Sequence, residues 1–235
     1  MGYLFDKIMD TNIDEVKMNN VAYGVSKVYE LVTQSLLFYC LGMFIGYNFI
    51  VPFMHLFVTI FTFVSVFAFV LSGNDSSKWF WMNSVAVSLG IISGPVIAIA
   101  YELDPLILPT AAVSTTAIFA FFTYHAKNIR DENMNYMGSF LYSSLLASTI
   151  VGFVMLFFRV SQFVQLVYLG LGLVMFCGFI SYDTKLMYDR FKKGETNYYD
   201  YAMNLFLDII NVFIKILNIL MILSGKKKDN KKDKQ

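Results

Sequence analysis

Long apolar segments, each about the length of a membrane-spanning helix, constrain the fold of this chain more than any other feature of its sequence. A helix needs about 20 mostly apolar residues to cross the bilayer core, because it rises about 1.5 Å per residue. The 235-residue chain is 57% hydrophobic and only 15% charged, which is not the balance of a soluble domain. The apolar segments are unbroken, which favours helices over the alternating strands of a membrane β-barrel.

Seven such segments predict an all-α membrane protein, a seven-transmembrane helix bundle. The predicted spans are residues 28–51, 54–72, 79–101, 106–124, 136–158, 163–188 and 198–223. We therefore divide the chain into a cytosolic N-terminal segment (1–27), a transmembrane domain (28–223) and a disordered lysine-rich tail (224–235). Glycine pairs four residues apart, in spans one and three, are typical of helices that approach closely. Pro95 is expected to kink span three.

The distribution of basic residues predicts the orientation. All basic loop residues except Arg159 fall on the side that holds the N-terminus and the loops after spans two, four and six. The positive-inside rule places that side in the cytosol. The six tail lysines would then lie across the membrane, so either the tail is tolerated there or the last segment does not fully cross.

Two aspartates lie within apolar segments, where an ionised carboxylate has a high free-energy cost. Asp208 lies inside span seven, and Asp183 lies towards the end of span six. An ionised group at membrane depth is expensive unless it is paired, wetted or protonated, so such residues are candidates for function. Both are at similar distances from the polar turn around Gly194, and antiparallel packing of spans six and seven could bring them together.

Two neighbouring carboxylates in a low dielectric cannot both ionise cheaply, so they would titrate as a unit. A shared proton would hold the helices together, and its loss would leave repulsion that water or a divalent cation relieves. The pair is therefore a candidate pH sensor and ion gate, and a weak calcium site. The alternative is that each aspartate only bonds polar neighbours such as Thr184 or Asn211 and fixes helix packing.

Two further ionisable residues lie near the spans. Glu102, at the end of span three, is either part of a pore mouth or a solvated loop end. Lys215 follows Asp208 by seven residues, on roughly the same helical face. It either snorkels towards the interface or pairs with a carboxylate.

Three stretches resemble the Bax inhibitor-1 family, also called the transmembrane Bax inhibitor motif family. They are GIISGP, which contains Gly94 and Pro95 and is followed by Glu102; CGFISYDT, which ends in Asp183 and Thr184; and NLFLDIIN, which contains Asp208 and Asn211. The lysine-rich tail also resembles that of eukaryotic members, which reside in the endoplasmic reticulum. Bacterial relatives carry a basic residue in span two that latches the acidic pair, and residues 54–72 contain no Lys or Arg.

The resemblance implies a bundle whose last helix is surrounded by the others. It also implies a multi-pass protein of the endoplasmic reticulum that leaks calcium in a pH-sensitive way and suppresses cell death. Asp183 and Asp208 would be the gate and sensor, with calcium transported or weakly bound and no other cofactor. The expected partners are membrane lipid, calcium, protons and Bcl-2-type cell-death regulators, and no nucleic acid.

Two other functions stay open at this point. The chain could be a membrane interaction protein that regulates apoptosis factors or other channels without conducting ions. Two intramembrane aspartates also suit an aspartyl protease. However, Asp208 follows Leu-Phe-Leu rather than Gly-x-Gly, and no Pro-Ala-Leu occurs near the C-terminus. We therefore expect no enzymatic activity.

Overall fold

The computed structural model describes the backbone of residues 2–49 and 52–232, and the side chains of residues 18–48 and 54–225. This described part contains seven α-helices and no strand. Each helix includes a segment long and apolar enough to cross a membrane, which confirms the predicted fold class. The helices are α1 (Gly2–Phe49), α2 (Pro52–Leu71), α3 (Asp75–Leu103), α4 (Ile107–Ala126), α5 (Asp131–Phe157), α6 (Gln162–Lys192) and α7 (Tyr198–Lys232).

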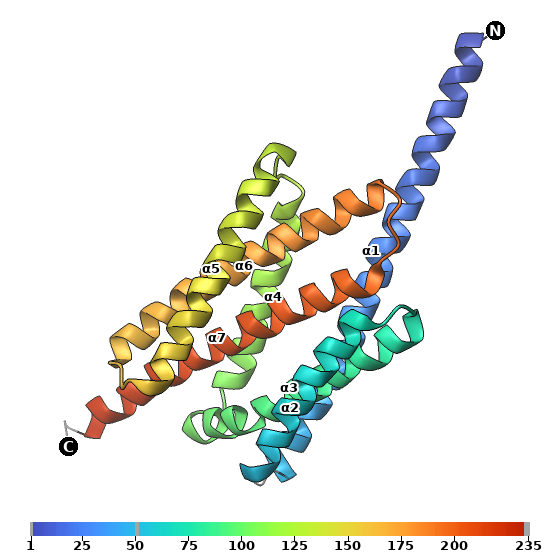
Figure 1. Ribbon diagram of the computed structural model, residues 1–235. Helices are drawn as coiled ribbons and strands as arrows, with labels where there is room; N and C mark the ends of the chain where they lie inside the picture. Colours follow the sequence, from blue (N-terminus) through green and yellow to red (C-terminus); the bar gives the residue numbers. More distant parts are fainter. Residues whose placement is uncertain (1, 50–51, 233–235) are drawn as a thin grey trace.

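The first and last helices extend beyond the predicted spans. α1 begins at Gly2 rather than at residue 28, and it projects from the bundle in Figure 1. α7 continues to Lys232, through most of the stretch for which the sequence predicts a disordered tail. Helix propagation costs little once an apolar span has nucleated it, and lysine is a good helix former. The side chains of residues 226–235 lie outside the described part.

Glycines bring α1 and α3 into backbone contact. A Cβ atom added at Gly42 would lie 2.2 Å from the carbonyl oxygen of Val87. One added at Gly94 would lie 2.3 Å from the carbonyl carbon of Gly46, and Gly90 is equally close to α1. The two small-residue motifs therefore face each other, and close approach of the backbones supplies the dispersion contacts that drive helix association in lipid.

Polar side chains fix the register of the same pair. The Tyr39 hydroxyl donates to Ser93 Oγ over 2.9 Å, and Ser35 Oγ donates to Asn83 Oδ1 over 3.2 Å. Pro95 lies inside α3 and has no N–H to donate to the carbonyl of Ile91. That carbonyl oxygen instead faces Gly46, where an added Cβ would lie 2.4 Å from it.

α7 is the central helix. It packs against α1, α3, α4 and α6, and it crosses the middle of the bundle in Figure 1. Half of the residues in its most apolar window are buried, the largest share of any helix. By contrast, among the described residues α5 packs against α6 alone, and α2 packs against α3 alone. The predicted central position of the last helix is thus confirmed, with α5 separated from α7 by a groove.

Candidate functional site

The α6–α7 hairpin positions the two aspartates. α6 ends in a Schellman motif, in which Gly194 N–H donates to Phe191 O and Glu195 N–H donates to Arg190 O, over 3.0 and 3.1 Å. Gly194 has a φ of 86°, a conformation that side chains disfavour. This reversal sends α7 back along α6 as an antiparallel neighbour.

Side chains around the turn hold the hairpin closed. Arg190 pairs with Glu195 at 2.8 Å, and the Tyr201 hydroxyl donates to the other Glu195 oxygen at 2.9 Å. These donors hold the pKa of the Glu195 carboxyl below its ordinary value, with the Arg190 bond as the larger cause. Lys78 at the start of α3 pairs with Asp200 at 2.7 Å, so α7 is also tied to α3 at this end.

Asp183 and Asp208 come together at similar depth. Asp183 precedes the last residue of α6 by nine residues, and Asp208 follows the first residue of α7 by ten. Both lie about 14 to 15 Å from the turn at about 1.5 Å per residue. Each is only 5% exposed, and their carboxyl groups are close enough to interact directly with each other.

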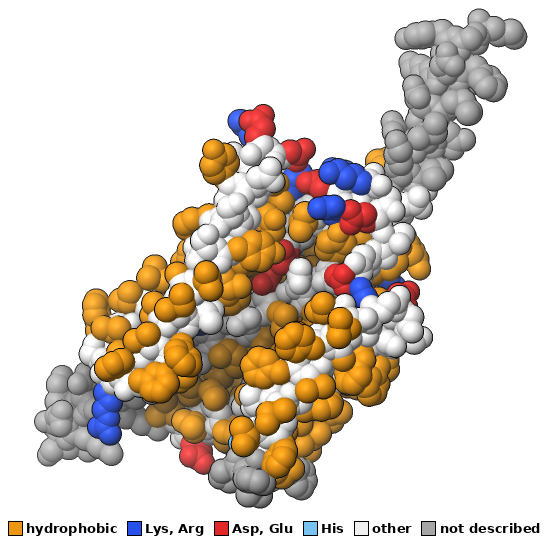
Figure 2. Space-filling view, viewed as in Figure 1, with side chains coloured by type: hydrophobic (Ala, Val, Ile, Leu, Met, Phe, Trp, Pro, Cys, Tyr) orange, Lys and Arg blue, Asp and Glu red, His pale blue; other side chains and the backbone are white. Residues whose placement is uncertain are grey.

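The pair lines a cavity of about 280 Å³ in the groove between α5 and α7. Its other walls are mostly apolar and aromatic, with two asparagine amides: Tyr142, Leu145, Phe176, Phe179, Asn204, Leu207 and Asn211. Tyr142 and Phe179 meet edge to face, with their ring centroids 5.5 Å apart. Figure 2 shows an acidic patch deep in a recess of an otherwise hydrophobic face. We call this cavity the acidic pocket.

The two carboxyl groups of the acidic pocket have no neutralising partner within the described side chains. Asp183 Oδ1 and Asp208 Oδ2 are buried, and neither has a hydrogen-bond donor within the described side chains. No lysine, arginine or histidine of that part pairs with either carboxyl group. Two bare charges in this setting would repel without compensation. One proton on the pair supplies the missing donor and removes one charge.

The remaining predicted residues have different surroundings. Asn211 lines the acidic pocket, and its amide donates to Leu207 O at 2.8 Å. Thr184 is fully buried, with its hydroxyl near those of Tyr29 and Thr123. Gly94 and Pro95 belong to the α1–α3 contact. Glu102 is exposed at the end of α3 and does not line the acidic pocket, so the structure does not bring it to the pair.

The acidic pocket offers few ligands for a metal ion. Among the described residues, no group of three or more His, Cys, Asp or Glu side chains is placed to hold one. Calcium takes six to eight oxygen ligands. The pair supplies carboxylate oxygens, and the other side-chain acceptors in the described lining are the amide oxygens of Asn204 and Asn211 and the Tyr142 hydroxyl. This donor set fits a weakly held or passing hydrated cation.

Sequence reasoning missed one ion-pair cluster, which is centred on a buried lysine. Lys185 is 9% exposed and binds Asp131 at 2.7 Å and Asp189 at 2.8 Å. The spacing of Lys185 and Asp189, four residues apart on one helix, could have indicated a pair. Asp131 belongs to α5, and nothing in the sequence links it to Lys185. This cluster ties α5 to α6 near the end of α6.

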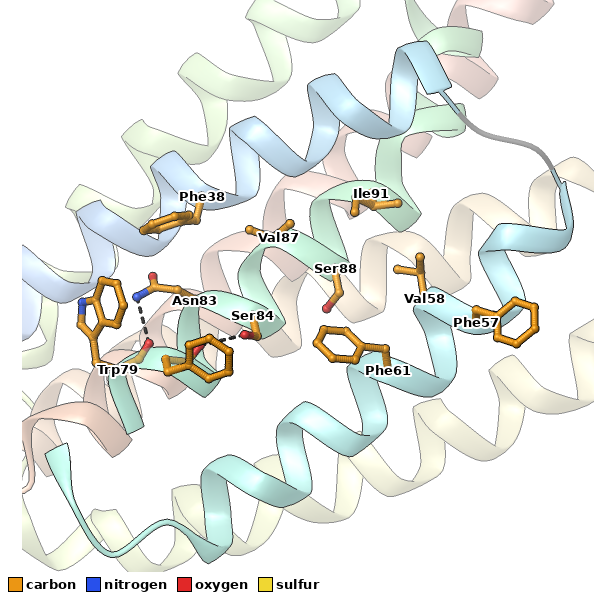
Figure 3. A pocket seen from close by; sticks show the side chains of 11 residues that line it. Phe38, Phe57, Val58, Phe61, Trp79, Asn83, Ser84, Val87, Ser88 and Ile91 are labelled. Atoms are coloured by element: carbon orange, nitrogen blue, oxygen red, sulfur yellow. Dashed lines mark hydrogen bonds between the residues drawn. The ribbon is translucent and has the colours of Figure 1, made fainter. Parts of the chain in front are cut away.

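A second cavity contains no ionisable group. It has a volume of about 500 Å³ and lies between α1, α2 and α3. Figure 3 shows its aromatic walls, which include Phe38, Phe61 and Trp79. Its polar groups have partners within α3 or on α1: Asn83 Nδ2 donates to Trp79 O at 2.9 Å, and Trp79 Nε1 donates to Gln34 Oε1 at 3.1 Å. It therefore lacks the chemistry of a proton or ion site.

Comparisons with known proteins agree on one family. Residues 21–225 match the family described as Bax1-I, inhibitor of apoptosis-promoting Bax1. The chain is 35% identical over 146 residues to Bax inhibitor 1 of Homo sapiens, and 31% identical over 152 residues to Bax inhibitor 1 of Oryza sativa subsp. japonica. It is also 32% identical over 142 residues to Bax inhibitor 1 of Arabidopsis thaliana.

These alignments cover part of each protein. The human alignment spans 62% of this chain and 60% of the relative, and the rice alignment spans 65% and 61%. The Arabidopsis alignment spans 60% of this chain and 58% of the relative. The chain thus matches about three fifths of the length of these relatives.

Proposed function

The chain belongs to the Bax inhibitor-1 family, and from this premise we propose that it is a pH-sensitive calcium leak channel of an intracellular membrane. The proposed gate and sensor are Asp183 and Asp208. We further propose a role in suppressing cell death and residence in the endoplasmic reticulum. The proposal assigns the protein no enzymatic activity and no cofactor, and calcium is its transported ion.

One observation carries this proposal: two buried carboxyl groups from adjacent helices face each other without a cationic partner among the described residues. With one proton on the pair, α6 and α7 are joined and the pocket carries a single charge. Loss of that proton leaves two neighbouring like charges, which favours separation of the helices and entry of water or a divalent cation. Proton binding and cation passage would then compete for the same oxygens.

The test is calcium flux into liposomes that contain the purified protein, measured across a range of pH. We expect Asp208→Asn to change the flux and flatten its pH profile, because an amide does not titrate. Asp75→Asn is the matched control, since Asp75 is exposed in the first turn of α3. If Asp208→Asn has the same flux and pH profile as the unmodified protein, the aspartate gate is wrong.

A second candidate is a membrane interaction protein that restrains cell-death factors without conducting ions. The observation that favours it is the presence of six lysines among the ten residues after Gly225, a charge cluster that suits binding to acidic surfaces. The test is a pull-down of Bcl-2-type regulators by the intact protein and by a variant that lacks residues 226–235. Loss of binding with the tail, together with intact binding by Asp208→Asn, would support this function. Unchanged binding without the tail would count against it.

A further inference from the structure

The groove between α5 and α7 continues past the acidic pocket. Because α5 contacts α6 but not α7 within the described residues, α6 forms the floor of this groove. A larger cavity of about 800 Å³ lies at the end near the α5–α6 loop. Its polar lining residues are Arg159, Gln165, Tyr168 and Asn218. We call it the distal pocket.

Lys215 lies between these two pockets along α7. It follows Asp208 by seven residues and precedes Asn218 by three, so it is about 10 Å from the first and about 5 Å from the second along the helix axis. Asn211 and Asn218 flank it four residues before and three residues after, on one helical face. An ion passing between the two pockets along α7 would therefore meet Lys215.

Glycines of two helices, α5 and α6, lie where Lys215 and its neighbour Tyr168 pack. Lys215 Nζ lies 4.4 Å from the centroid of the Tyr168 ring. A Cβ atom at Gly172 of α6 would lie 2.9 Å from Lys215 Cε, so the end of the lysine side chain lies directly over this glycine and would have to shift if a larger residue replaced it. Tyr168 is itself held by α5, because its hydroxyl donates to Ser148 O at 3.3 Å and occupies space left by Gly152.

The charge of Lys215 is not neutralised by an acid. No carboxylate of the described residues lies within 4.0 Å of its ammonium group. Its partner is the π face of Tyr168, which attracts a cation but carries no net charge. Lys215 therefore does not pair with a carboxylate, one of the two roles that the sequence leaves open. The positive charge, held over α6 between the two pockets, repels other cations.

We propose that Lys215 is the electrostatic barrier on the cation path between the acidic pocket and the distal pocket. Tyr168 acts as the positioning residue that holds the ammonium group across the groove. This inference rests on the proposed calcium leak, and it adds a second control element about two helical turns from the aspartate pair. The barrier limits the leak whatever the proton occupancy of the pair.

The test is the rate of calcium entry into liposomes for Lys215→Met and Lys215→Arg. Methionine keeps the length and apolar character of the side chain and removes the charge. The Coulomb energy between a unit charge and a divalent cation about 10 Å apart, at an effective dielectric constant near 20, corresponds to a rate change of roughly a hundredfold. We therefore expect roughly a hundredfold faster calcium entry for Lys215→Met and little change for Lys215→Arg. Tyr168→Leu, which removes the ring, should increase the rate in the same direction.

Two controls make the outcome decisive. Arg159→Gln removes a positive charge from an exposed side chain that lines the distal pocket. Because water screens an exposed charge, this variant should change the calcium rate far less than Lys215→Met does. Asp208→Asn, measured in parallel, tests the gate itself. If Asp208→Asn alters the pH profile while Lys215→Met conducts no faster than the unmodified protein, the barrier is wrong and the gate stands. If neither variant differs from the unmodified protein, both proposals fail.

Discussion

At the scale of single residues, the environment of each charged side chain separates those that hold the fold from those proposed to act. Lys78, Lys185 and Arg190 each have a carboxylate partner. Asp183, Asp208 and Lys215 have no oppositely charged partner among the described residues. Burying a charge without such a partner is costly, and a fold gains no stability from it. Asp183 and Asp208 line the acidic pocket, and Lys215 lies over Tyr168, which lines the distal pocket.

Glu195 gives a prediction of pH dependence outside the spans. Its bonds to Arg190 and Tyr201 lower its pKa from the ordinary 4.5, so its contribution to stability is present above that value. It is lost as pH falls through the lower pKa of the folded state. We expect Glu195→Gln to lower the thermal unfolding midpoint slightly at pH 7 and to have no effect at strongly acidic pH. The midpoint can be followed by circular dichroism in detergent.

The control for this prediction is a double-mutant cycle with Arg190→Met. Removal of Glu195 should have little effect once Arg190 is absent. A midpoint difference that stays constant from neutral to acidic pH would show that the ion pair is not its cause.

At the scale of helices, packing is specified by the absence of side chains as much as by their presence. α1 and α3 touch through four glycines, and Lys215 is seated by Gly172. Glycine costs helix stability in isolation, but it lets backbones and long side chains approach where a methyl group would collide. The spacing of the glycines along the sequence predicts which helices have a face of small residues. Only the assembled bundle shows which of these faces contact each other.

Gly94→Ala is the prediction at this scale. The new methyl group would lie 2.3 Å from the Gly46 backbone, so α1 and α3 would have to separate. We expect a loss of roughly 1–3 kcal/mol in unfolding free energy, as for an overpacked core. The measurement is unfolding by SDS titration in mixed micelles.

Gly170→Ala is the matched control, because Gly170 lies in α6 with nothing within 4 Å of an added Cβ. Alanine is a better helix former there by about 1 kcal/mol, so this variant should be as stable as the unmodified protein or more so. Equal losses for the two variants would contradict the proposed glycine contact.

At the scale of the whole molecule, seven crossings place the turns alternately on the two sides of the membrane. The turns after α2, α4 and α6 share one side, where Lys78, Lys185 and Arg190 form their ion pairs. The acidic pocket is nearer to this side, and the distal pocket is nearer to the other. The groove between α5 and α7 therefore runs from one membrane face towards the opposite one.

Cysteine labelling tests this topology. In a background with Cys40 and Cys177 replaced by alanine, we expect Asn128→Cys and Thr196→Cys to react with a membrane-impermeant maleimide from the same side. Ser161→Cys should react only from the opposite side. Reaction of Ser161→Cys together with Thr196→Cys would mean that α6 does not cross the membrane.

The sequence by itself determined the number of helices, their approximate bounds and the family, because apolar length and motif residues are properties of consecutive positions. It also singled out Asp183 and Asp208, since charge within an apolar run is visible without a structure. Only the tertiary structure decided that these two carboxyl groups meet, that Glu102 stays apart, and that Lys215 faces Tyr168 rather than an acid. Each of these depends on the rotation of one helix against another, which is set by contacts between residues far apart in the chain.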